Sequence, residues 1–398
     1  MKVLIATDWY APAVNGVVTS VMNLRKELML RGHDVRVLTL SETTRSWKGD
    51  GVTYIASVGI GKLYPGARLR TSPAREYIDE IVEWRPDVIH TQCEFSTFLV
   101  ARKIAAKLNI PIVHTYHTIY ENYTHYFSPN KAGGRHMVAA ISRWVIKQTG
   151  CVIAPSEKVR SILRGYNIDR EIRVIPTGLD LGAFAEKPDD AGLSRLKRKL
   201  GIPTGNRVLL FIGRLAKEKN LEEVLNLFAA LRPEHSTLLI VGDGPHKAAL
   251  ESLASRLGID RDVVFTGMVR PENVADYYHL GDLFVCASGS EAQGLTYIEA
   301  LAAGLPVLCR RDDCLKDIIV DGQNGWQYED GEDFSGKLRF FMSGGAGDMR
   351  GCARLTAERK FSSTHFAEQV ESAYLDAIDA AKGCFAFGKS RIDTRSTY

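Results

Sequence analysis

Short apolar runs alternate with longer amphipathic stretches along most of the 398 residues. The run KVLIAT at 2–7 predicts a strand, and DVRVLTL at 34–40 predicts the next one. Between them, apolar positions recur with a helical period over 16–32, and Gly32 predicts the end of that helix. The rhythm continues through DVIHTQ, IPIVHTYH, GCVIAPS and IRVIPTG. Such alternation favours a parallel sheet covered by helices on both faces.

A second series of the same kind begins with RVLLFIG at 207–213. Helices are expected at about 220–231 and 246–257, and the strands TLLIVGDG, DVVFTG, LFVCAS and PVLCR complete the series. The stretch between the two series, 179–206, is polar and contains Pro and Gly, so it predicts a linker with one short helix. The pattern therefore predicts an α/β protein of two doubly wound domains, with ligands at the carboxyl ends of the strands.

Composition narrows the class of protein. Hydrophobic residues make up 45% of the chain, yet the apolar runs fall far short of the roughly 20 residues that cross a bilayer. The N-terminus lacks the pattern of a secretory signal, so we expect a cytoplasmic protein. The seven cysteines are odd in number and scattered without a C-x-x-C pair, which argues against a disulfide framework and a zinc site.

The net charge of +4 is unevenly distributed. Residues 1–178 carry 24 Lys and Arg against 15 Asp and Glu, whereas the remainder carries 27 against 32. The basic excess is greatest over 131–170. Three explanations are open for this excess: an ordinary solvated surface, a surface that binds an anionic membrane, or a surface that binds a nucleic acid. No nucleic-acid-binding motif accompanies it, so we expect no nucleic acid partner.

Four charged side chains stand where this fold binds ligands. Arg214 and Lys219 follow the strand RVLLFIG, and they predict either an anion site or two surface cations. In SGSEAQGLTYIEALAAG, Glu291 precedes a predicted helix start and Glu299 lies inside the helix. Each glutamate is either structural, as a cap or a solvated side chain, or a ligand for hydroxyl groups.

Two helix starts could bind an anion. A helix N-terminus at Gly294-Leu295-Thr296 would present unpaired N–H groups. The turn at Asn15-Gly16 is a second place where backbone could approach a phosphate. The absence of G-x-G-x-x-G argues against a nicotinamide-binding domain.

The segments FIGRLAKEKNLEEVL, LLIVGDGP, VVFTGMV and SEAQGLTYIEALAAGLPVL, in this order, resemble the donor half of retaining glycosyltransferases of family four. That family has the GT-B fold, which implies two doubly wound Rossmann-like domains facing each other across a cleft. The segment HTYHTIYENYTHY at 114–126, together with EAQGLTYIEAL, is most similar to bacterial 1,2-diacylglycerol 3-glucosyltransferases.

The resemblance also divides the chain into regions with expected tasks. It implies an acceptor-binding, membrane-facing domain at 1–178, the linker 179–206 and a donor-binding domain at 207–362. A helix at 363–382 would pack back on the first domain, and 383–398 would form a tail.

The resemblance implies a nucleotide-sugar co-substrate, with UDP-glucose as the best candidate, and no other cofactor. By this resemblance, Arg214 and Lys219 match the family's diphosphate-binding pair. Glu299 matches the residue that binds the ribose, and Glu291 matches the residue that contacts the donor sugar. Further donor contacts would come from Gly16, the backbone around Met268 and the turn Gly294-Leu295-Thr296. Retention is expected by attack on the same face within an ion pair, with a covalent intermediate at Glu291 as the alternative. We expect no metal, because arginine and lysine side chains and helix termini would do the work of a divalent cation.

On the acceptor side, His117 matches the family's active-site histidine, and His114 is its rival. Tyr120, Asn122 and Tyr126 are expected to line the acceptor pocket. A lipid acceptor would require the enzyme to sit on an anionic membrane surface, at the inner face of the cell membrane. Two basic segments with interleaved apolar residues, 68–84 and 131–147, could dock there or could be ordinary core helices.

Three functions are therefore open at this point. The first is a membrane-associated lipid glucosyltransferase, as the resemblance implies. The second is a soluble retaining glycosyltransferase that acts on a sugar or inositol acceptor. The third is a nucleotide-sugar-binding protein that transfers nothing, and the complete set of four charged residues argues against it.

Overall fold

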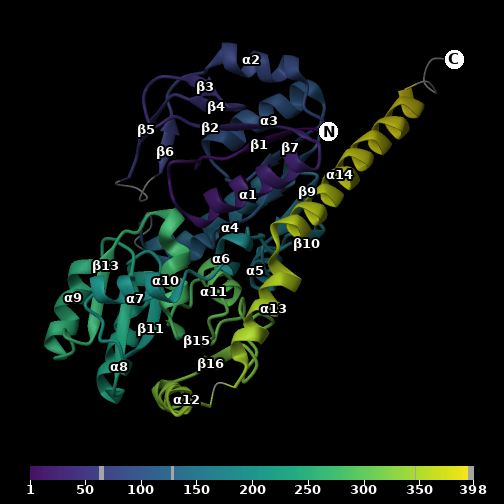
Figure 1. Cartoon of the computed structure of the whole chain (residues 1–398). Helices are drawn as coiled ribbons and strands as arrows, with labels where there is room; N and C mark the ends of the chain where they lie inside the picture. The colour runs from purple at the N-terminus through teal and green to yellow at the C-terminus, as the bar shows by residue number, and fades with distance from the viewer. Residues whose placement is uncertain (62–66, 127–129, 346, 393–398) are drawn as a thin grey trace. The chain divides into compact units, whose positions relative to one another are not determined.

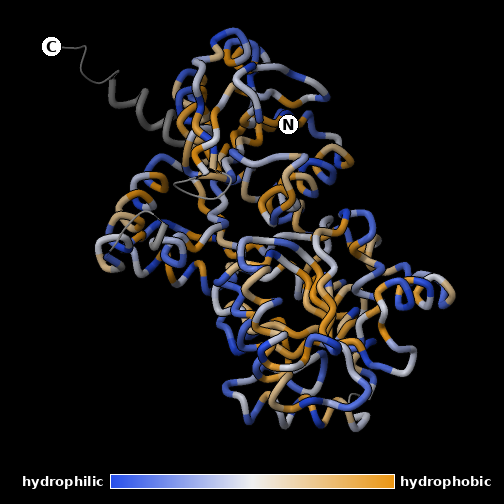
Figure 2. The backbone as a smooth tube through the Cα atoms, turned by 90° about the vertical axis from the view of Figure 1, so that its left-hand side faces the viewer, coloured by the Kyte–Doolittle hydropathy of each residue, from blue (hydrophilic) through white to orange (hydrophobic). Residues whose placement is uncertain are grey.

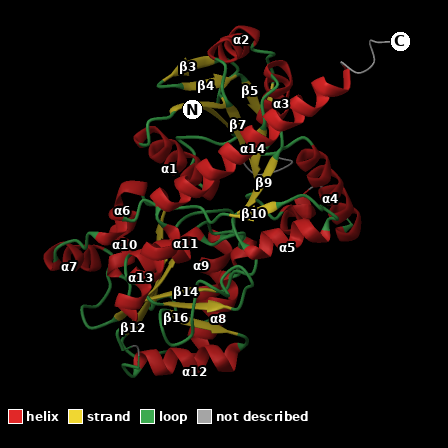
Figure 3. Ribbon diagram, turned by 90° about the vertical axis from the view of Figure 1, so that its right-hand side faces the viewer, coloured by secondary structure: helices red, strands yellow, loops and turns green. Residues whose placement is uncertain are grey.

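The computed structural model describes residues 1–61, 67–126, 130–345 and 347–392, although only the backbone is described for 125, 126, 131 and 383–392. The chain forms two compact units. The first unit is Met1–Leu179 with Ser363–Tyr398, and the second unit is Asp180–Ser362. Each has strands at its centre and helices outside (Figures 1 and 3), and the most hydrophobic tubes in Figure 2 are strands. The prediction of two doubly wound α/β domains is confirmed.

The first unit contains an eight-stranded sheet in the order β10-β9-β8-β7-β1-β2-β4-β3. All neighbours are parallel except β3 and β4. The strands are β1 Lys2–Ala6, β2 Asp34–Leu40, β3 Trp47–Gly49, β4 Val52–Ile55, β7 Val88–Thr91, β8 Ile112–Thr115, β9 Cys151–Ala154 and β10 Ile172–Val174. A separate antiparallel pair consists of β5 Ser57–Gly59 and β6 Arg68–Arg70.

Helices cover both faces of this sheet. They are α1 Gly16–Leu30, α2 Arg75–Trp84, α3 Ser96–Leu108, α4 Lys131–Lys147, α5 Glu157–Gly165 and α14 Ser363–Ile392, with the 3-10 helix η1 Tyr120–Tyr126. On one face, α1 and α14 pack together over a core that includes Val21, Val113 and Val370. On the other face, α2 and α3 enclose a core that includes Leu4, Ile89 and Ile104. The C-terminal helix therefore completes the core of the first unit.

The second unit contains a six-stranded, fully parallel sheet in the order β13-β12-β11-β14-β15-β16. The strands are β11 Arg207–Ile212, β12 Ser236–Val241, β13 Val263–Gly267, β14 Leu283–Cys286, β15 Val307–Arg310 and β16 Gly325–Tyr328. The strand order reverses direction between β11 and β14, and ligands of doubly wound sheets bind at the carboxyl ends of the strands at such a reversal.

The second unit has helices in two groups. Helix α8 packs against α9 and α12, whereas α11 packs against α13 and α6. The helices are α6 Gly182–Ala185, α7 Asp190–Lys199, α8 Leu221–Leu231, α9 Lys247–Arg256, α10 Val274–Leu280, α11 Leu295–Ala302, α12 Gly331–Met342 and α13 Met349–Phe361, with the 3-10 turns η2 Lys217–Lys219 and η3 Pro271–Asn273.

Two regions differ from the sequence-based expectations. The expected linker 179–206 contains two helices, α6 and α7, and all of it after Leu179 belongs to the second unit. Asp189 caps α7 by accepting a hydrogen bond from the Gly192 N–H at 2.7 Å, a local signal that the polar composition hid. Helix α14 runs to Ile392, ten residues beyond its expected end at 382. The final part of the expected tail, 393–398, lies outside the described residues.

For the segment 68–84, the sequence left a docking segment and a core helix open, and the structure shows a strand followed by a core helix. It comprises the short strand β6 and the helix α2, whose Ile81 and Trp84 are buried in the core beneath α3. The Trp84 indole N–H donates a hydrogen bond to Asp34 Oδ2 at 2.7 Å. The amphipathic pattern of this segment thus belongs to the core.

Two further observations bear on the class of protein. Over the described residues, no helix is both long enough and apolar enough to cross a membrane. The six cysteines whose side chains are described are free thiols.

Candidate functional site

The turn after β11, which carries Arg214, packs closely against the loop after β12. A Cβ at Gly242 would lie 1.9 Å from the carbonyl oxygen of Gly213, and one at Gly244 would lie 2.3 Å from that of Leu215. Only glycine at these two positions lets the loops after β11 and β12 approach so closely. The Leu215 N–H also donates to the Asp243 carbonyl at 2.9 Å. The exposed Arg214 side chain therefore rises from a fixed turn at the carboxyl edge of the sheet.

Lys219 and Glu291 are brought together from neighbouring strand ends. Lys219 ends the turn η2 after β11, and Glu291 lies in the loop after β14. Lys219 Nζ donates to Glu291 Oε1 at 2.6 Å, and the two side chains are 23% and 11% exposed. An ion pair that is partly withdrawn from water keeps more of its Coulomb energy than a fully exposed one. The sequence predicted a lysine and a glutamate at the site, and the structure adds that they form a pair.

The start of α11 has the geometry of an anion site. Gly294 adopts the left-handed conformation, with φ +79°, and a Cβ there would lie 2.7 Å from the Tyr297 ring. The first N–H groups of an α-helix, here those of Leu295 and Thr296, have no partner within the helix. They lie on the positive end of the helix dipole. The loop that carries Glu291 thus leads directly into a group of backbone N–H donors.

Glu299 lies one turn further along α11, and a tyrosine fixes its position. Tyr278, fully buried on α10, donates its hydroxyl proton to Glu299 Oε2 at 2.6 Å. Burial raises the pKa of Glu299 to about 7, and the Tyr278 hydrogen bond offsets part of that rise. The carboxylate is therefore held in one orientation and is poised to titrate near neutral pH.

Arg310 is a cation at the same edge that sequence reasoning missed. It ends β15, and its guanidinium donates to Glu223 Oε1 at 2.6 Å. Glu223 also accepts from the Tyr328 hydroxyl at 3.0 Å and from the Asn220 side-chain amide at 2.6 Å. Glu223 thereby ties β15 and β16 to the turn that carries Lys219. The sequence did carry a signal for it: two arginines, Arg310 and Arg311, follow the strand run PVLC directly, much as Arg214 follows VLLFIG.

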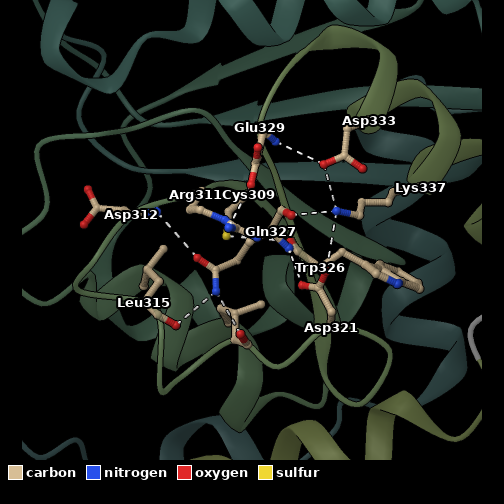
Figure 4. A network of polar contacts seen from close by, with 11 residues as sticks. Cys309, Arg311, Asp312, Leu315, Asp321, Trp326, Gln327, Glu329, Asp333 and Lys337 are labelled. Atoms are coloured by element: carbon tan, nitrogen blue, oxygen red, sulfur yellow. Dashed lines mark hydrogen bonds and ion pairs between the residues drawn. The ribbon is translucent and has the colours of Figure 1, made fainter.

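The loop after β15 is fixed by polar contacts of its own (Figure 4). The Gln327 side chain donates to the Ile319 carbonyl at 3.0 Å and accepts from the Asp312 N–H at 3.5 Å. Lys337, from α12, donates to the Gln327 carbonyl at 2.7 Å and to Asp333 Oδ2 at 2.9 Å. These groups satisfy one another, so we interpret the network as structural support for the strand ends.

In the first unit, His117 follows β8 and contacts Gln92, which follows β7. His117 Nε2 and Gln92 Oε1 lie 2.5 Å apart. The imidazole is half-buried, whereas Gln92 is buried. Burial, together with nearby His114, lowers the pKa of His117 to about 3, so the ring is neutral at neutral pH.

His114, the rival of His117, points into the protein. It is fully buried, with Nδ1 at 2.8 Å from the Thr91 hydroxyl oxygen and Nε2 at 3.4 Å from Glu94 Oε1. Glu94 also accepts a hydrogen bond from the Tyr120 hydroxyl. This buried glutamate beside an expected acceptor residue was missed in the sequence, where CEF at 93–95 carries no recognisable pattern.

The remaining predicted residues are spread along both units. Asn122 is half-buried on η1, and the side chain of Tyr126 lies outside the described residues. Gly16 is the first residue of α1, whose cap Asn15 accepts from the Val18 N–H at 3.0 Å. Met268 follows β13, two strands from β11, and its side chain is 70% exposed.

An apolar face lies on α3 and α4 of the first unit. It comprises five exposed side chains: Phe95, Leu99, Met137, Ile141 and Trp144. The three on α4 are spaced at i, i+4 and i+7, whereas Val145 on the same helix is buried. The Arg102 guanidinium lies 5.2 Å from the centre of the Trp144 ring. Arg102 thus borders this α3–α4 apolar face, which lies beside Tyr120, whose ring is 5.7 Å from that of Phe95.

Within the part of the chain that the structure describes, no group of three or more His, Cys, Asp or Glu side chains is arranged to hold a metal ion. A pocket near the amino ends of β11, β12 and β13 is lined by Asn206, His235 and Asp262 among others. It lies at the opposite edge of the sheet from Arg214 and Glu291, so we assign no part of the site to it.

Comparison with known proteins gives the family. Residues 14–183 match the family described as Glycosyltransferase Family 4, and residues 194–355 match Glycosyl transferases group 1. The chain is 36% identical to alpha-monoglucosyldiacylglycerol synthase of Streptococcus pneumoniae, over 95% of this chain and 86% of that one. It is 32% identical to the enzyme of the same name from Acholeplasma laidlawii, over 95% of this chain and 98% of that one.

A solved structure supports the fold. HepE of Anabaena in complex with UDP-glucose superposes with a TM-score of 0.73 at 19% identity, covering 94% of this chain and 100% of that one. The two matched domains, the near full-length relatives and the two parallel α/β units agree with one another. The chain belongs to the glycosyltransferases of family four and has their GT-B fold.

Proposed function

We propose that this glycosyltransferase moves a glucosyl residue from UDP-glucose to the free hydroxyl of diacylglycerol, with retention at the anomeric carbon. The observation that carries the proposal is the 36% identity to a relative named alpha-monoglucosyldiacylglycerol synthase, which extends over 95% of this chain. The side chains at the carboxyl edge of the second unit have the chemistry that such a donor requires.

The second unit binds the donor through charge and backbone N–H groups. Negative charge grows on the diphosphate as the sugar–phosphate bond breaks, and fixed cations near that charge lower the barrier. Arg214, Lys219 and the N-terminus of α11 supply this positive potential. Glu299, held by Tyr278 through one oxygen, keeps its other oxygen for the ribose hydroxyls.

In the transfer, the bond between C1 and the phosphate oxygen breaks, and its electron pair leaves with the diphosphate. The acceptor oxygen bonds to C1 on the same face, and its proton passes to the departing phosphate oxygen. Glu291 accepts hydrogen bonds from sugar hydroxyls. Its ion pair with Lys219 occupies one carboxylate oxygen and makes the group a weaker nucleophile, which supports this role over a covalent intermediate.

The first unit receives the acceptor. His117 contacts the reacting sugar, and Tyr120 and Asn122 line the acceptor site. The α3–α4 apolar face is suited to the acyl chains and to the surface of an anionic membrane, because insertion of apolar side chains and attraction of nearby cations add to each other. Accordingly, we place the enzyme at the inner face of the cell membrane as a peripheral protein.

The reaction needs no metal ion in this proposal, because cations of the chain and helix N-terminal N–H groups neutralise the diphosphate. Treatment with EDTA should leave the rate of transfer unchanged. A loss of activity that magnesium restores would show that the diphosphate is bound through a metal ion.

A mass-spectrometric product assay tests the proposal as a whole. Purified enzyme is incubated with UDP-glucose, UDP-galactose or GDP-mannose and vesicles that contain diacylglycerol. A monohexosyl diacylglycerol formed from UDP-glucose, with one UDP released for each product molecule, is the expected result. A product formed only with a soluble sugar or inositol acceptor would contradict the lipid acceptor. Binding of UDP-glucose without any product would contradict transfer itself.

A further inference from the structure

A chain of buried polar side chains connects His117 to the C-terminal helix of the first unit. Tyr374, on α14, places its hydroxyl 2.7 Å from His90 Nδ1. His90 Nε2 lies 3.1 Å from the side-chain nitrogen of Gln92, and the Gln92 oxygen lies 2.5 Å from His117 Nε2. Tyr374, His90 and Gln92 are each at most 1% exposed. This series of hydrogen bonds thus links the proposed catalytic imidazole to Tyr374, which lies 257 positions later in the sequence.

The hydrogen-bonding capacity of each member determines where the protons lie. The Gln92 nitrogen can only donate, so His90 Nε2 must accept, and the single proton of a neutral His90 is then on Nδ1. His90 Nδ1–H donates to the Tyr374 hydroxyl oxygen. At the other end, the Gln92 oxygen can only accept, so His117 carries its proton on Nε2.

The neighbours of His90 agree with this assignment. The Thr115 hydroxyl lies 2.7 Å from His90 Nε2; that nitrogen has a single lone pair, and accepting from either the Thr115 hydroxyl or the Gln92 nitrogen leaves the His90 proton on Nδ1. Burial lowers the pKa of His90 well below its usual value, with His117 and His114 adding to the effect, so the ring carries only one proton. The charged neighbours that act on His90 are His117 and His114, and Glu94 lies beside His114.

We propose that Tyr374 is a positioning residue that, through His90 and Gln92, fixes His117 in the tautomer with its proton on Nε2. The Nδ1 lone pair of His117 is then available to accept a hydrogen bond from a substrate hydroxyl. This consequence for catalysis rests on the proposed role of His117 in transfer, whereas the tautomer assignment stands on the hydrogen-bond chain alone.

Removal of the Tyr374 hydroxyl should reverse the donor and acceptor roles along this series of hydrogen bonds. In Tyr374→Phe, the buried Nδ1–H of His90 loses its acceptor, so His90 shifts its proton to Nε2. The Gln92 amide must then turn its oxygen toward His90 and its nitrogen toward His117. His117 in turn becomes the acceptor at Nε2 and carries its proton on Nδ1.

Two other variants separate this effect from general damage. Tyr116→Phe is the matched control, because Tyr116 is equally buried and its hydroxyl contacts Ser142 at 3.0 Å, outside the relay. Gln92→Glu replaces the amide with a group that only accepts. It should keep the proton of His117 on Nε2 and move that of His90 from Nδ1 to Nε2.

Long-range ¹H–¹⁵N spectra of the full chain, labelled with ¹⁵N-histidine, measure these tautomers directly, with signals assigned by their loss in His90→Asn and His117→Asn. Wild type and Tyr116→Phe should show His117 protonated on Nε2, and Tyr374→Phe should show both rings reversed. His117 protonated on Nδ1 in wild type, or unchanged tautomers in Tyr374→Phe, would overturn the proposal. So would Gln92→Glu leaving His90 protonated on Nδ1.

Kinetics of the same variants test the catalytic consequence. Tyr374→Phe should lower kcat by about tenfold or more, because a misplaced proton removes a hydrogen bond made in the transition state. The KM for UDP-glucose should stay within about twofold, because the donor contacts are unchanged. A reversal of the tautomers with an unchanged kcat would instead overturn the role of His117 in transfer.

Discussion

The two units build their candidate sites from opposite kinds of side chain. In the second unit, the carboxyl edge of the sheet carries charges in contact: Lys219 with Glu291 at 2.6 Å and Arg310 with Glu223 at 2.6 Å. In the first unit, the equivalent edge holds His90 and His117, whose pKa values are lowered by burial until both rings are neutral.

This difference follows from the chemistry that each unit is proposed to perform. A diphosphate leaving group gains negative charge, so the donor unit needs cations whose positions are fixed before the reaction. An acceptor hydroxyl and a sugar are neutral, so directed hydrogen bonds from neutral rings suffice to orient them. A buried cation near such groups would also incur a large desolvation cost.

The largest effect is expected when a cation is removed from the second unit, which tests whether fixed positive charge acts there. Arg214→Ala or Lys219→Ala should lower kcat by about 10² or more, because each lost contact to the leaving group is worth a few kcal/mol. Steady-state kinetics of transfer provide the measurement. Lys217→Ala is the control, since Lys217 is an exposed lysine on the same turn. Near-normal turnover in both variants would show that positive charge at this edge does not assist departure of the diphosphate.

A smaller effect is expected when the ribose ligand is removed. Glu299→Ala should weaken binding of the nucleotide by about 1.5–3 kcal/mol, since hydrogen bonds to a charged acceptor are the stronger kind. Calorimetric titration with UDP measures the affinity, and Glu251→Ala, on the surface of α9 in the same unit, controls for the loss of a carboxylate. An unchanged dissociation constant in Glu299→Ala would remove Glu299 from the site.

The raised pKa of Glu299 predicts a pH dependence. UDP-glucose should bind the ionised carboxylate, so its affinity should rise about tenfold between pH 6 and pH 8, as a group with a pKa of about 7 loses its proton. The rise should vanish in Glu299→Gln. A flat profile in wild type would contradict the assignment.

The same group affects stability with a definite sign. The folded chain holds the Glu299 proton more tightly than the unfolded chain does. The resulting stabilisation is complete below the ordinary glutamate pKa of 4.5 and is lost as the pH rises through about 7. Chemical denaturation at several pH values should therefore show wild type losing stability relative to Glu299→Gln across this window.

The smallest expected effect concerns the membrane. Lys147→Ser, at the end of α4, should weaken binding to vesicles containing phosphatidylglycerol by about 1 kcal/mol. The difference should fade as salt is added, because the Debye length is only about 10 Å at 0.1 M. Lys187→Ser, an exposed lysine of the second unit, is the control. Equal binding of wild type to neutral and anionic vesicles at low salt would remove the electrostatic argument.

The sequence predicted the two α/β series because alternating strands and helices leave a strong local pattern. It left 68–84 open between a docking segment and a core helix, since an amphipathic period looks the same whether Ile81 and Trp84 face a core or a membrane. At 131–147 the same kind of pattern corresponds to a helix with three large apolar residues exposed and with Val138, Val145 and Ile146 buried. Periodicity identifies a face, but only packing shows what covers it.

The site shows the same division between local and distant information. Arg214, Lys219, Glu291 and Glu299 stand in motifs, so their positions at strand ends could be predicted from the sequence. Tyr374 could not, because it reaches His90 only through the packing of α14 against the first unit. The pairing of Lys219 with Glu291 likewise joins residues 72 positions apart.

One pair of variants tests the division of tasks most directly, with UDP affinity and transfer rate measured on each. We predict that Arg214→Ala raises the dissociation constant of UDP by about tenfold or more, since a hydrogen bond to a charged group is worth about 1.5–3 kcal/mol. His117→Ala should leave that constant within about twofold and still lower the transfer rate by about 10². Equal loss of UDP affinity in both variants, or none in Arg214→Ala, would contradict the account.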